Sequence, residues 1–71
     1  MAISYNKLWK LLVDKKMSKA DLRKAVGMAP NTLTKMRKAE PVSMEIMIRI
    51  CEFFRCDIGD VMELILEEGV A

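Results

Sequence analysis

At 71 residues the chain is long enough for one small domain, and a domain of that size buries only about 60% of the surface that its unfolded chain exposes. It carries a net charge of +2, two cysteines and no histidine, which excludes Ser-His and Cys-His catalytic pairs and a histidine-ligated metal centre. A run of about 18 apolar residues, the minimum for a membrane-spanning helix, does not occur.

The first predicted helix covers residues 5–15. Its apolar side chains recur with the spacing of one helical face and are Tyr5, Leu8, Trp9, Leu12 and Val13. We expect Trp9 to fill the core from this face. The residues before and within this helix mix apolar and charged positions without a small-residue cleavage site, so we read no signal peptide and expect a cytoplasmic protein.

Two short helices follow, joined by a tight turn. Ser18 and Asp21 have the spacing of a capping box at the start of the second helix, and Gly27 supplies the left-handed residue that commonly ends a helix. Pro30 suits the first turn of a third helix, which begins at residue 29 or 30 and continues to about residue 38. Because so short a connection leaves no room for an antiparallel hairpin, the two helices cross steeply in a helix-turn-helix.

Two more helices are predicted in the second half of the chain. Ser43 is a good N-cap for a fourth helix over residues 44–54, and Asp57 with Asp60 caps a last helix over residues 58–66. Nothing reads as a strand longer than a few residues. The predicted fold is all-α, a compact five-helix domain over residues 1–71 with its helix-turn-helix at about residues 18–38.

Charge is distributed unevenly along the chain. Residues 1–40 hold ten Lys or Arg against three acids, a net charge of +7, whereas residues 41–71 hold two against seven, a net charge of −5. This asymmetry suggests that the first half faces a polyanion, the alternative being a solvated lysine-rich surface. On the polyanion hypothesis the lysines expected to neutralise phosphates are Lys7, Lys10, Lys19 and Lys38.

The third helix separates into two faces. Leu33 and Met36 face inward, and the residues that share the opposite, polar face are Asn31, Thr34, Lys35 and Lys38. Asn can make a bidentate contact to adenine, Lys can donate to guanine, and the Thr methyl and hydroxyl can approach a thymine or a phosphate. A helix that starts at Pro30 also exposes unpaired amide hydrogens, which suit a phosphate. Although a merely solvated face has the same pattern, the preceding glycine turn and basic half favour a helix that reads the DNA major groove.

Two stretches of the chain carry a resemblance to a known family. "SKADLRKAVGMAPNTLTKMRK" and "VSMEIMIRICEFFRCDIGDVMEL" resemble the successive motifs of the phage-repressor-like (Cro-like, XRE) helix-turn-helix proteins of bacteria and phages. The resemblance implies a five-helix transcriptional regulator that binds double-stranded DNA, commonly as a homodimer on a palindromic operator. By this resemblance, the positions at which relatives touch bases or nearby phosphates are occupied here by Ala29, Pro30, Asn31, Thr34, Lys35 and Lys38. Lys19 occupies a position at which relatives touch the DNA backbone.

The sequence departs from this family at two places. Arg23 stands where relatives usually have a small residue, so its side chain must snorkel or the helix pair must tilt. Ala29 and Pro30 stand where relatives often begin the recognition helix with Ser or Thr, which removes those side-chain contacts.

The other functional hypotheses are an enzyme and a protein-interaction module. We expect that the protein is not an enzyme and binds no cofactor. We interpret Cys51 and Cys56 as reduced cysteines whose side chains pack in the domain. The rival to DNA binding is an antitoxin-like or adaptor module that uses the same fold. Its support is a surplus of apolar side chains in the last two predicted helices, namely Ile46, Ile48, Phe53, Ile65 and Leu66. Such a surplus is equally expected of a homodimer.

Overall fold

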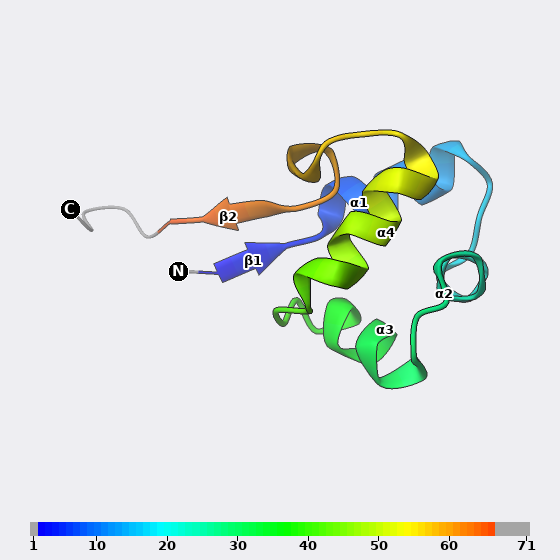
Figure 1. Ribbon diagram of the computed structural model, residues 1–71. Helices are drawn as coiled ribbons and strands as arrows, with labels where there is room; N and C mark the ends of the chain where they lie inside the picture. The colour runs from blue at the N-terminus through cyan, green and yellow to red at the C-terminus, as the bar shows by residue number, and fades with distance from the viewer. Residues whose placement is uncertain (1, 67–71) are drawn as a thin grey trace.

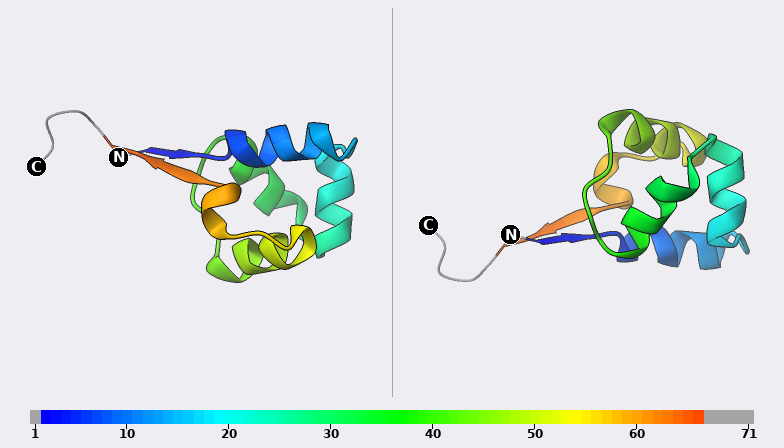
Figure 2. Two further views of the ribbon diagram at one scale, coloured as in Figure 1. Left: turned by 90° about the horizontal axis from the view of Figure 1, so that it is seen from above. Right: turned by 90° about the horizontal axis from the view of Figure 1, so that it is seen from below.

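The computed structural model describes residues 2–66 and is mostly helical (Figure 1). Its elements in chain order are β1 (Ala2–Ser4), α1 (Asn6–Asp14), α2 (Lys19–Val26), α3 (Pro30–Arg37), α4 (Met44–Phe54), a 3-10 turn η1 (Ile58–Asp60) and β2 (Glu63–Ile65). In Figure 2, α1 and α4 run along opposite sides of the body, α2 closes one end, and the two strands project from the other end. Among residues 2–66, no helix is long and apolar enough to cross a membrane.

The predicted boundaries of α2 are confirmed by its caps. The Ser18 hydroxyl accepts a hydrogen bond from the Asp21 amide, and the Asp21 carboxylate accepts one from the Ser18 amide, both at 3.0 Å. Gly27 ends the helix with φ at +70°, a conformation that costs other residues backbone strain. A β-carbon at Gly27 would lie 3.8 Å from the Arg49 guanidinium, so conformation, and not lack of space, requires glycine here.

The helix α4 also begins and ends where the sequence predicts. The Ser43 hydroxyl caps it by accepting a hydrogen bond from the Ile46 amide. At the other end Arg55 is left-handed, with φ at 54°, and the Cys56 amide donates to the Cys51 carbonyl at 3.0 Å. Both thiols are free and half-buried, and burial raises their pKa values, so they stay protonated at neutral pH.

The prediction of a fifth helix over residues 58–66 is wrong. Asp57 and Asp60 do form the expected capping box, but the turn that they cap ends at Asp60. The segment Glu63–Ile65 then pairs antiparallel with Ala2–Ser4, so that Ile3 lies opposite Leu64. Residues 61–66 are apolar except for Glu63, so they form a nearly continuous run instead of the single stripe of an amphipathic helix. Strand pairing supplies hydrogen-bond partners for the backbone N–H and C=O groups of this segment. Over residues 2–66 the domain therefore has four helices, a 3-10 turn and a small sheet, and it is mostly helical instead of all-α.

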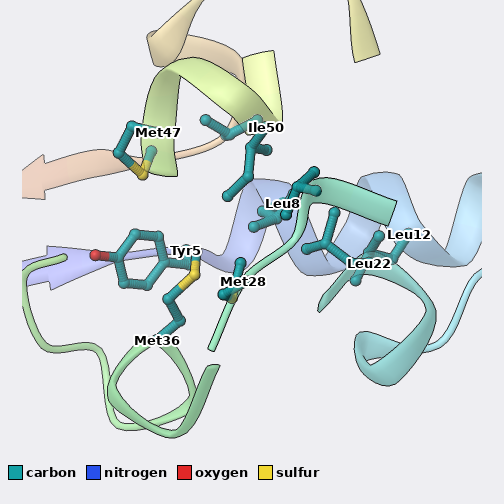
Figure 3. Close-up of a cluster of buried hydrophobic side chains, with 10 residues drawn as sticks. Tyr5, Leu8, Leu12, Leu22, Met28, Met36, Met47 and Ile50 are labelled. Atoms are coloured by element: carbon teal, nitrogen blue, oxygen red, sulfur yellow. The ribbon is translucent and has the colours of Figure 1, made fainter. Parts of the chain in front are cut away.

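One cluster of buried side chains joins all four helices to the last turn (Figure 3). Its members are Tyr5, Leu8, Leu12, Leu22, Val26, Met28, Met36, Met47, Ile50 and Val61. Leu22 of α2 is completely buried, as are Leu8 of α1 and Ile50 of α4. Because α2 is held between α1 and α4 in this way, its orientation fixes the position of the turn and of α3 after it.

Arg23 reaches across the turn between α2 and α3. Its guanidinium donates to the Met28 carbonyl at 3.4 Å, on the far side of the turn. The residue as a whole is half-buried, which is compatible with a side chain that snorkels along the turn.

Candidate nucleic-acid interface

The helix α3 presents the polar face that the sequence predicts. Asn31, Thr34 and Lys35 lie on the side of the helix away from the core, and Lys38, which ends the helix, is exposed beside them. On the other side Met36 is fully buried and Leu33 is half-buried against the core. Figure 1 shows α3 at the lower edge of the domain, where one side of the helix is free of other elements.

The amino-terminal end of α3 is open to an anion. Ala29 takes the N-cap position with extended backbone and has no polar side chain, and Pro30 occupies the first turn. The first turn also contains no acid. Pro30 has no amide hydrogen and the Thr32 amide donates to the Ala29 carbonyl at 3.0 Å, so the Asn31 amide and the positive end of the helix dipole remain for a phosphate.

Thr34 is more restricted than the sequence suggests. Its hydroxyl donates to the Pro30 carbonyl one turn earlier, at 3.1 Å. Because that hydrogen bond occupies the hydroxyl hydrogen, the oxygen can accept a hydrogen bond but is not free to donate one to a phosphate. Thr34 is thus suited to a thymine methyl or a base-edge donor, and not to the DNA backbone.

Lys19 lies at the first position of α2 and contacts an aromatic ring. Its ammonium is 4.4 Å from the centroid of the Trp9 ring. The apolar stripe of the first helix predicts that Trp9 fills the core. Trp9 is only half-buried, however. The spacing of apolar residues in the sequence does not indicate that a lysine lies over its ring.

Lys7 and Lys10 lie apart from the other lysines expected to bind phosphate. The Lys7 ammonium donates to the Gly59 carbonyl at 3.1 Å, and Lys10 lines a hollow with Lys7, Phe54 and Asp60. The lining of this hollow comes from α1, the end of α4 and η1. In Figure 1 the segment that follows α4 lies at the upper side of the domain, whereas α3 lies at the lower side. The structure therefore groups Lys38 with Asn31 and separates Lys7 and Lys10 from them.

The helix-turn-helix carries half of the basic residues of the chain. Residues 19–38 include six Lys or Arg and a single acid, Asp21. Hydrogen bonds from the Ser18 amide and side chain hold the pKa of Asp21 below its ordinary value, so this carboxylate is ionised at neutral pH. Since it already occupies the amino-terminal end of α2, any phosphate contact there depends on the ammonium of Lys19.

Comparison with known proteins agrees with this geometry. Residues 7–67 match the model of the Cro/C1-type helix-turn-helix DNA-binding domain. The solved structure described as the transcriptional regulator VanUg is 48% identical and superposes with a TM-score of 0.88, over 93% of this chain and 88% of that one. No curated protein matches the sequence significantly. The family match over most of the chain, the likeness to VanUg and the helix-turn-helix with its basic, exposed α3 lead to one conclusion: the chain belongs to the Cro/C1-type helix-turn-helix DNA-binding domains.

Proposed function

We propose that residues 1–71 form one DNA-binding domain that regulates transcription in the cytoplasm by sequence-specific binding to double-stranded DNA. The observation that carries the proposal is the exposed polar face of α3 on a helix-turn-helix whose inner face packs against the core. DNA binding is the function of the family, which agrees with the expectation that the chain is no enzyme. The likeness to VanUg, which is described as a transcriptional regulator, supports the regulatory role.

In this proposal α3 enters the major groove, with its amino-terminal residues nearest the bases. Asn31 and Lys35 read base edges, because both are exposed one turn apart on the same face. Thr34 adds an apolar or accepting contact between them. The residues assigned to phosphates or to the edge of the groove are Lys19, Ala29, Pro30 and Lys38.

A salt titration tests the proposed phosphate contacts. Lys38→Ala should weaken binding to every duplex by a similar factor and reduce the slope of log affinity against log salt by about one unit, because one counterion fewer is released. The matched control is Lys10→Ala, which removes the same charge from the hollow beside η1 and should leave the slope unchanged. Fluorescence anisotropy with a duplex enriched by the wild type from random DNA, and with a scrambled duplex, measures both. Wild-type affinity that is indifferent to salt would contradict DNA binding by this surface.

We further propose a homodimer on a palindromic operator. Of the apolar residues predicted to be in surplus, Ile48, Phe53, Ile65 and Leu66 are about half exposed or more, whereas Ile46 is half-buried against the core. In a two-fold dimer, a second copy would cover these side chains on α4, on β2 and directly after β2, and the two α3 helices would lie about one DNA turn, roughly 34 Å, apart. The protein-interaction hypothesis rests on the same side chains, and family membership favours the DNA-binding alternative.

Sedimentation tests the dimer directly. The wild type should sediment as a dimer at micromolar concentration, and Leu66→Glu should shift it toward monomer because a charge would be buried at the interface. Val13→Glu is the matched control, since Val13 is equally accessible, at 75% exposed against 70% for Leu66, but lies on α1. A wild type that is monomeric both free and on DNA contradicts this proposal.

A further inference from the structure

The face of α1 that carries Trp9 borders the segment that follows α3. Tyr5 and Trp9 lie one turn apart, with ring centroids 6.3 Å apart and a tilted arrangement. The Tyr5 hydroxyl donates to the carbonyl of Glu40, shortly after the end of α3, at 2.8 Å. Tyr5, the N-cap of α1, and Trp9 within α1 therefore connect the segment after α3 with the amino-terminal end of α2, where Lys19 lies.

Trp9 and Lys19 are each held in place by other parts of the fold. The indole is half-buried and packs against the core cluster, so its orientation is set by the surrounding side chains. The backbone of Lys19 is fixed by the capping box of Ser18 and Asp21. The Lys19 ammonium lies 4.4 Å from the ring centroid, within the distance over which a cation is attracted to an aromatic face.

We infer that Trp9 is a positioning residue for DNA binding, whose indole face holds the Lys19 ammonium ready for a DNA phosphate. The inference rests on the proposed function. A free lysine side chain loses rotamer freedom when it pairs with a phosphate, and a side chain already restrained over a ring loses less. An ammonium has three N–H donors, so the one side that faces the indole leaves donors for a phosphate.

A double-mutant cycle separates this role from ordinary packing. Trp9→Leu should weaken binding to the enriched duplex about two- to five-fold, the factor that corresponds to a cation–π contact at an exposed site. In a Lys19→Ala background the same Trp9→Leu change should weaken binding less than about 1.5-fold, because the cation that it positions is gone. Circular dichroism at the temperature of the titration establishes that each variant is folded. Equal losses in the two backgrounds would overturn the inference, since packing alone acts whether or not Lys19 is present.

Two further measurements complete the test. Lys19→Arg keeps a cation that stacks on indole and should bind within about two-fold of the wild type. Trp9 is the single tryptophan of the chain, so acrylamide quenching reports its exposure without DNA. Lys19→Ala should increase that quenching, and unchanged quenching would overturn the inference.

The outcomes also distinguish this inference from the proposed function. A wild type that binds with the expected salt dependence, combined with additive losses in the cycle, overturns the role of Trp9 alone. A wild type that binds no duplex overturns the proposed function and this inference with it.

Discussion

Leu22→Ala should lower the free energy of unfolding by about 2–5 kcal/mol, the range for a buried leucine that leaves a cavity. Leu22 is fully buried within the core cluster, in a helix that packs against α1 and α4. A chain of 71 residues has a thin stability margin, because a single core of this size rarely supplies more than about 3–5 kcal/mol. The variant should therefore lose most of its stability and, with it, the fixed position of the helix-turn-helix.

Thermal denaturation followed by circular dichroism measures this loss. The Tm should fall by about 8 °C or more, because 1 kcal/mol corresponds to roughly 4–8 °C in a domain of this size. Protein concentration is held constant, since association would otherwise change the apparent stability. Val13→Ala is the control, with a side chain that is 75% exposed, and should change stability by less than about 0.5 kcal/mol. A Leu22→Ala variant as stable as that control would mean that Leu22 does not anchor α2.

Asn31→Ala should cost about 1–3 kcal/mol of binding free energy on the enriched duplex and much less on scrambled DNA. Asn31 is exposed in the first turn of α3, where a side chain of a groove-bound helix reaches base edges. Loss of a bidentate contact removes discrimination between bases, whereas the phosphate contacts that bind any sequence remain.

The same anisotropy titrations measure this difference. Asn6→Ala is the matched control, because Asn6 is also an exposed asparagine near a helix start but lies on α1. It should leave affinity for both duplexes unchanged. If Asn31→Ala lost affinity equally on the two duplexes, α3 would not read sequence, and the protein-interaction hypothesis would move ahead of the proposed function.

Features that depend on near neighbours in the chain could be predicted from the sequence. The capping box at Ser18, the left-handed Gly27 and the cap at Ser43 each act over three or four residues, and each places a helix end correctly. The two faces of α3 follow from helical periodicity alone, so the exposure of Asn31 and the burial of Met36 were also predictable. The family resemblance, drawn from the same stretches, is confirmed by the family model.

The strand β2 could not be predicted, because its partner is distant in sequence. The backbone N–H and C=O groups of residues 63–65 could form hydrogen bonds in either a helix or a strand. They form a strand because Ala2–Ser4, at the other end of the sequence, lies beside them and pairs with them. Long-range pairing of this kind leaves no periodic signal in a segment of three residues.

The same distinction applies to the candidate site. By itself the sequence determined the four helices, the turn at Gly27 and the polar face of α3, since backbone conformation and periodicity are local properties. Only the tertiary structure decided which lysines share a surface. Lys7 and Lys19 count equally as charges along the chain, but packing directs Lys7 to the Gly59 carbonyl and Lys19 to the face of Trp9. A side chain's partner depends on which segments the core brings together, and that is a property of the whole fold.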